Sequence, residues 1–150
     1  NYREKIQRGR LHFQYLPGES VLLRSRYERV FFQGKTRESG RLAFVDFQYK
    51  PGHKPFGFST RVTWFDTDGY SSRIYAYEND MLYTFPVSTF FDSGIQSYLN
   101  MKYRVGNSLD CWLKLAGTFY TKKNQEDDSN TTGKPNSHKT EIKFQVRLRL

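Results

Sequence analysis

The chain has 150 residues, a length that fits one domain with its own core or one small barrel. Only 37% of the residues are hydrophobic while 17% are aromatic, and no segment approaches the roughly 18 uncharged apolar residues of a transmembrane helix. A helical membrane protein is therefore excluded, and the single cysteine, Cys111, excludes an internal disulfide and a cysteine-based metal site.

Alternation of apolar and polar residues, bounded by turn residues, predicts an antiparallel all-β chain without a helix. The expected strands have the approximate ranges 9–16, 20–33, 41–50, 56–65, 72–85, 94–105, 109–121 and 140–150. The long polar stretch 122–139 precedes the last strand and is expected to be an external loop. We predict a single β-barrel domain over residues 1–150, either an up-and-down transmembrane barrel of about eight strands or the C-terminal part of a larger barrel.

The final strand shows the pattern most clearly, because apolar and polar side chains alternate from Thr140 to Leu150. Successive side chains of a strand point to opposite faces, so Ile142 and Phe144 share one face while Lys143 and Arg147 share the other. A strand of about 9–11 residues with this alternation can span an outer membrane. A soluble barrel or sandwich would instead bury the apolar face, and the final strand by itself does not distinguish the two architectures.

Sorting all strands by parity gives one apolar, aromatic-rich face and one face that carries charges of both signs. In a membrane barrel the apolar face meets lipid and the charges pair inside a narrow lumen, because an unpaired buried charge is costly. The charged residues predicted to line the lumen are Arg24, Arg26, Glu28, Asp46, Arg61, Glu78, Asp80, Lys102, Arg104, Lys114, Lys143, Arg147 and Arg149. The residues predicted to face lipid are Phe13, Tyr15, Phe47, Tyr49, Trp64, Tyr75, Tyr77, Tyr83, Phe85, Tyr103, Phe119, Phe144, Leu148 and Leu150.

Loop lengths predict the orientation of such a barrel, since periplasmic turns are short and external loops longer. With an even number of strands, both ends of the chain fall on the periplasmic side. Two residues fit this scheme poorly. Asn79 would face lipid unless a bulge lies at 78–80, and Arg29 is tolerable only near a membrane edge, where its side chain can snorkel.

The run from Arg73 to Asp80, Arg-Ile-Tyr-Ala-Tyr-Glu-Asn-Asp, resembles the C-terminal barrel region of a family of Bacteroidota outer-membrane proteins. Segments 65–68 and 98–104 and the basic final strand support the resemblance, which covers about residues 40–150. In that family the barrel region often follows helix-hairpin-helix, competence-protein-like segments that are thought to bind DNA. No residues here match such a segment, so the resemblance implies an outer-membrane barrel but no direct nucleic-acid binding.

Chemically reactive groups are sparse in the sequence. His12, His53 and His138 lie far apart, and a lumen hydrogen-bond network is favoured for His12 over a Ser-His-Asp site. Residues 66–69, Asp-Thr-Asp-Gly, have calcium-like spacing but lack the distal Glu of a calcium loop, which favours a turn. The net charge of +9 does not indicate nucleic-acid binding, because cations and aromatics fall on opposite faces. We predict no catalytic residue, metal or cofactor.

The predicted function is therefore that of a non-enzymatic, porin-like protein of the bacterial outer membrane. It would serve as a membrane anchor, a scaffold or a narrow basic-lined pore for transport within a cell-envelope assembly. The expected partners are the lipid bilayer, lipopolysaccharide, and other outer-membrane or periplasmic proteins. A soluble β-barrel or sandwich that binds a ligand or polysaccharide is the alternative, and an outer-membrane hydrolase is a third hypothesis.

Overall fold

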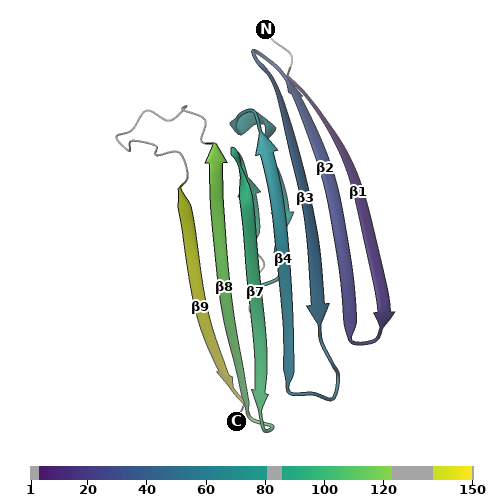
Figure 1. Cartoon of the computed structure of the whole chain (residues 1–150), viewed down its shortest axis with the longest axis vertical. Helices are drawn as coiled ribbons and strands as arrows, with labels where there is room; N and C mark the ends of the chain where they lie inside the picture. Colours follow the sequence, from purple (N-terminus) through teal and green to yellow (C-terminus); the bar gives the residue numbers. More distant parts are fainter. Residues whose placement is uncertain (1–3, 81–85, 123–136, 150) are drawn as a thin grey trace.

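The structure is a computed structural model that describes residues 4–80, 86–122 and 137–149. Seven strands form one antiparallel sheet whose order follows the chain except for one skipped hairpin (Figure 1). These strands are β1 (Lys5–Gly18), β2 (Val21–Gln33), β3 (Arg37–Tyr49), β4 (Phe56–Thr67), β7 (Ser93–Val105), β8 (Leu109–Lys122) and β9 (His138–Leu148). The connection from β4 to β7 contains a 3-10 turn, η1 (Tyr70–Ser72), and a hairpin formed by β5 (Ile74–Tyr77) and β6 (Val87–Phe90).

The seven strands of the large sheet form where alternation predicts strands, and their register aligns residues of one parity in rows. One such row runs from Leu11 through Tyr27 and Ala43 to Trp64. The turn between β7 and β8 contains Gly106 with a φ of 58°, a left-handed conformation that favours glycine. The all-β antiparallel class is thus confirmed. No helix in the described part of the chain is long and apolar enough to cross a membrane.

The prediction of a spanning strand over 72–85 is wrong. β5 ends at Tyr77 and pairs with β6 in a separate two-stranded sheet, while β4 pairs directly with β7. In Figure 1 this hairpin lies behind the large sheet rather than within it. The physical reason is that Ile74 and Ala76 of β5 are apolar and become buried against the sheet, which favours folding the hairpin onto the sheet. Residues 81–85, the end of the predicted strand, lie outside the described residues.

The large sheet also does not close into a barrel within the described residues. β1 pairs with β2 alone and β9 with β8 alone, so the prediction of a closed eight-stranded barrel is not met. Because the sheet has an odd number of strands, β1 starts at one end of the sheet and β9 finishes at the other (Figure 1). The prediction that the two ends of the chain fall on the same side is therefore wrong. The turns at 18–21, 49–56 and 105–109 lie at the end where β9 finishes.

A small apolar core lies between the hairpin and the large sheet. It is formed by Val30, Leu42, Phe44 and Phe65 of the sheet and by Ile74, Ala76 and Phe90 of the hairpin. The ring of Phe65 lies 5.1 Å from that of Phe90, in a tilted arrangement that favours aromatic packing. Gly40 allows η1 to approach the sheet, because a Cβ at this position would lie 2.3 Å from the carbonyl oxygen of Ser72.

Candidate functional site

A sheet of a soluble protein usually buries its apolar face and exposes its charged face to water. The large sheet shows the reverse. On one face, called here the apolar face, large hydrophobic side chains such as Leu11, Val62 and Phe144 are exposed. On the other, called the polar face, charged side chains such as Asp46, Arg61 and Lys114 are buried. The hairpin β5–β6 lies over this polar face, since Ile74 and Ala76 pack there. The candidate site is therefore the charged surface between the sheet and the hairpin.

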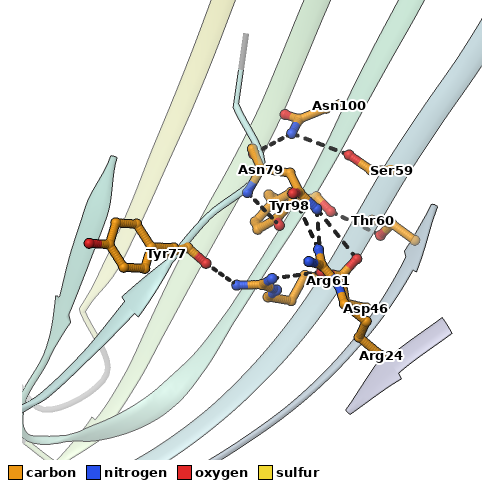
Figure 2. A network of polar contacts seen from close by, with 9 residues as sticks. All are labelled: Arg24, Asp46, Ser59, Thr60, Arg61, Tyr77, Asn79, Tyr98 and Asn100. Carbon is orange, nitrogen blue, oxygen red and sulfur yellow. Dashed lines mark hydrogen bonds and ion pairs between the residues drawn. The ribbon is translucent and has the colours of Figure 1, made fainter. Parts of the chain in front are cut away.

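Asp46 of β3 is the centre of the main polar network (Figure 2). Its carboxylate is fully buried and accepts hydrogen bonds from Arg24 of β2 at 2.5 Å and from Arg61 of β4 at 2.6 Å. Cross-strand pairing brings these residues together, because Arg24, Asp46 and Arg61 occupy one row of the sheet. Arg61 also lies over the ring of Phe44, with its guanidinium carbon 3.9 Å from the ring centroid. The network therefore balances buried charges within the sheet.

The segment after β5 is bound to the same network. Arg61 donates a hydrogen bond to the carbonyl of Tyr77 at 2.6 Å, and the side-chain amide of Asn79 donates to Asp46 at 3.3 Å. The backbone N–H of Asn79 donates to the hydroxyl of Tyr98 at 3.1 Å, and the amide of Asn100 donates to the carbonyl of Asn79 at 2.5 Å (Figure 2). Asn79 thus faces the polar side of the sheet, and the difficulty of placing it in lipid does not arise.

A second cluster surrounds the buried carboxylate of Glu28 on β2. Arg10 of β1 donates to it at 2.9 Å, and Arg26 forms a further ion pair. Arg26 also donates to the carbonyl of Tyr75 at 3.2 Å. This cluster therefore connects the first strand of the sheet with the hairpin.

A third cluster connects the hairpin with the last two strands. Lys114 of β8 is buried and lies 3.3 Å from Glu78 and 3.2 Å from Asp80, carboxylates that follow β5. Lys143 of β9 lies 3.3 Å from Asp80 and 2.9 Å from Glu141. Lys114 and Lys143 are direct neighbours in the sheet register, so the hairpin carboxylates offset a repulsion between like charges.

The fourth cluster is strongly basic and lies near the turn between β7 and β8. The buried carboxylate of Asp110 accepts hydrogen bonds from Arg104 at 3.0 Å, from Arg149 at 2.5 Å and from Arg147. Lys102 lies over the ring of Trp112, 5.4 Å from its centroid. Cations exceed carboxylates in this cluster, which gives this end of the polar face a positive field.

Most of the predicted lumen-lining residues share the polar face. Ten of them lie on the strands of the large sheet at polar-face positions and Arg149 directly follows β9, whereas Glu78 and Asp80 reach this face from the segment after β5. Sequence reasoning did not single out Asn79, Tyr98 or Asp110 for this site. Asp110 has a signal, since it is the one acidic residue of β7 and β8 and lies at the parity of Arg104, Arg147 and Arg149.

The predicted lipid-facing residues divide into three groups. Those on the apolar face of the large sheet are exposed or partly exposed: Phe13, Tyr15, Phe47, Tyr49, Trp64, Tyr103, Phe119, Phe144 and Leu148. Tyr75 and Tyr77 belong to the hairpin instead, so placing them on the apolar face is wrong, because β5 is not a strand of the large sheet. Tyr83, Phe85 and Leu150 lie outside the described residues.

Two acidic residues of the 66–69 segment, which has calcium-like spacing, form polar contacts with β3. Asp68 accepts hydrogen bonds from the backbone and hydroxyl of Ser39 at 2.8 Å, and Asp66 pairs with Arg41 at 2.7 Å. His12 is exposed on β1 at a polar-face position opposite Arg26. Within the described ranges, no group of three or more His, Cys, Asp or Glu side chains is arranged to hold a metal ion.

Arg73, between η1 and β5, lies on the side of the hairpin away from the sheet core. Its Nε donates to the hydroxyl of Tyr75 at 2.5 Å, and its guanidinium lies 4.2 Å from the ring centroid of Tyr70. The hydrogen bond to Tyr75 raises the pKa of the Arg73 guanidinium, which therefore stays charged at any physiological pH.

Similarity to known proteins assigns no function to this chain, so the assignment depends on the geometry. No protein-family model, no curated protein and no solved structure matches this chain. The resemblance of the 73–80 run to Bacteroidota outer-membrane proteins therefore stays a prediction.

Proposed function

We propose that the chain forms part of an outer-membrane β-barrel that acts as a membrane anchor or as a narrow, basic-lined pore. The observation that carries this proposal is the reversed exposure of the two faces of the large sheet. Exposing so many large apolar side chains to water is unfavourable, whereas lipid stabilises them. The buried charges on the other face are then lumen residues, each offset by a partner.

The height of the apolar face supports a membrane-spanning sheet. On β7 the apolar-face positions run from Ile95 to Val105, which is about 34 Å along the strand. With a strand tilt of about 40°, this length covers about 26 Å across the bilayer, close to the apolar band of an outer-membrane barrel.

Aromatic residues at the two rims of the apolar face also support the proposal. Tyr27, Trp64 and Phe119 lie towards the end with the two longest connections, 68–92 and 123–137. Tyr49 and Tyr103 lie towards the end with the short turns, where β9 finishes. Girdles of this kind mark the two interfaces of an outer-membrane barrel, and short turns mark its periplasmic side. We therefore place the turns at 18–21, 49–56 and 105–109 in the periplasm.

A barrel built from this sheet needs further strands. An exposed strand edge in a bilayer leaves backbone N–H and C=O groups without hydrogen bonds, which costs several kcal/mol for each group. β1 and β9 each have one pairing partner in the described structure. Additional strands would satisfy both edges, and the hairpin β5–β6 would then lie inside the lumen and narrow it.

The soluble alternative requires a second layer over the apolar face. No described element covers this face, because the hairpin packs on the polar side. A soluble sheet would also bury far fewer ion pairs than this polar face contains. These two features favour the membrane proposal over a soluble sandwich.

Membrane fractionation followed by gel electrophoresis tests the proposal. We expect the protein to sediment with the cell envelope, to need detergent for release, and to migrate differently before and after heating. A soluble periplasmic protein measured in parallel provides the control. A protein that stays in the supernatant without detergent would contradict the proposal. Anion-selective current in planar bilayers would then support a pore, and a folded protein without current would support an anchor.

A further inference from the structure

The apolar face of the large sheet is hollowed over strands β1 to β4. The hollow measures about 550 Å³, within the range of ligand pockets, and its lining includes Leu11, Phe13, Tyr27, Val62 and Trp64. It exists because two central positions of the face have small side chains, Ser25 on β2 and Ala43 on β3. Their cross-strand neighbours are large, so the small residues form the floor and the large ones the walls.

Two arginines lie on the same face directly beside this hollow. Arg29 of β2 and Arg41 of β3 are cross-strand partners, one row beyond Tyr27 and Ala43. A row is displaced by two residues, or about 7 Å along the strands. On the other side of Arg29, its partner on β1 is Gly9, where an added Cβ would meet no atom within 4 Å. The surface beside Arg29 is therefore open to an incoming group.

The charges of these two arginines are balanced unequally. Arg41 pairs with Asp66 at 2.7 Å. Arg29 lies over the ring of Phe31 at 4.4 Å and, among the described residues, pairs with no carboxylate. Like charges directly opposite each other destabilise a sheet unless an anion offsets them. Guanidinium groups bind phosphate particularly well, because their fixed N–H donors match its oxygens.

We propose that this surface is a binding site for one phosphorylated lipid of the outer membrane. The proposal rests on the proposed function, since it assumes that the apolar face meets the bilayer. The lipid phosphate binds Arg29 and Arg41, and one acyl chain fills the hollow above Ser25 and Ala43. The geometry matches an amphiphile, because the arginine row directly follows the apolar row of Leu11, Tyr27 and Trp64, as head groups follow acyl chains in a bilayer.

Tryptophan fluorescence in vesicles tests this site. The chain has two tryptophans; Trp64 lines the hollow, whereas Trp112 is buried on the polar face. Vesicles of phosphatidylcholine would contain a small fraction of brominated lipid, either phosphatidic acid or phosphatidylcholine. Bromine quenches indole fluorescence on contact. We expect brominated phosphatidic acid to be enriched beside Trp64 roughly fivefold over brominated phosphatidylcholine. The reason is that Arg29 pairs with no described carboxylate, and one such cation near a membrane surface attracts an anionic lipid by about this factor.

Two variants distinguish a built site from general membrane contact. Arg29→Gln should remove the enrichment, and Ala43→Leu should weaken quenching by filling the hollow. Arg37→Gln is the matched control, since Arg37 lies at the same parity of β3 but beyond the arginine row, opposite Gln33.

Equal enrichment in wild type and Arg29→Gln would overturn the lipid site, with Arg29 then merely snorkelling to the interface. Quenching by brominated phosphatidylcholine would still support the membrane proposal in that case. No quenching of Trp64 by either brominated lipid would overturn both proposals.

Discussion

An arginine placed at the middle of the apolar face should destabilise the protein far more than one placed at its rim. Leu115 of β8 pairs with Leu99 of β7, close to the centre of the run from Ile95 to Val105. Leu99 lies six residues from Val105, which is about 20 Å along the strand and, at a tilt of about 40°, about 16 Å in depth. An arginine at the bilayer midplane of a barrel costs about 2–4 kcal/mol, and near the interface about 0–1 kcal/mol.

We therefore expect Leu115→Arg to lower the free energy of unfolding by about 2–4 kcal/mol and Val105→Arg by less than about 1 kcal/mol. The assay is urea unfolding of the protein in phospholipid vesicles, followed by tryptophan fluorescence and by the heat-modifiable gel band. Both side chains are partly exposed, at 38% and 48%, so in a water-soluble protein the two variants should differ little. Equal destabilisation by the two variants would refute the membrane-spanning assignment of this face.

Three further predictions concern the polar face. Asp46→Ala leaves Arg61 buried without its carboxylate and should lower the free energy of unfolding in urea by about 3–5 kcal/mol. Replacing both Asp46 and Arg61 by Leu should recover most of this loss. Gly40→Ala should push η1 away from the sheet and raise hydrogen exchange in β5 and β6, whereas Gly18→Ala, where a Cβ meets no atom, should not. Asp110→Asn leaves three guanidiniums without their shared carboxylate, so the reversal potential of a pore should shift towards anion selectivity.

The sequence predicts the faces of the large sheet well, because side-chain parity in a strand follows from backbone geometry alone. Asp46, Arg24 and Arg61 fall on one face by parity, and their pairing in one row then depends on strand register. Register is not visible in a single strand. The connections between the clusters, such as the bond from Arg61 to the carbonyl of Tyr77, therefore appear only in the structure.

The hairpin was not predictable from alternation, since residues 72–85 alternate as a spanning strand does. A signal is nevertheless present at the polar-face parity. Leu42, Phe44 and Phe65 interrupt the charged residues at one end of that face, and Ile74 and Ala76 are apolar where a lumen strand would carry polar groups. Apolar residues on an otherwise charged face indicate that another apolar segment covers them. The 73–80 run is that segment, which explains why it combines apolar residues with Glu78 and Asp80.

Under the proposed barrel, the distribution of charge over the polar face predicts which side chains the completing strands would carry. The central strands contain the buried carboxylates Glu28, Asp46 and Asp110, each surrounded by cations. Between residues 8 and 14 the polar-face positions of β1 are instead Arg8, Arg10, His12 and Gln14, and Arg147 and Arg149 lie at the end of β9 and directly after it. A lumen in a low-dielectric surrounding tolerates such cations when carboxylates or water offset them. Strands that pair with β1 and β9 would bring their own side chains into this lumen, in the same rows as these cations. We therefore expect the completing strands to carry carboxylates at lumen positions, so that one set of residues satisfies both the backbone edges and the excess positive charge.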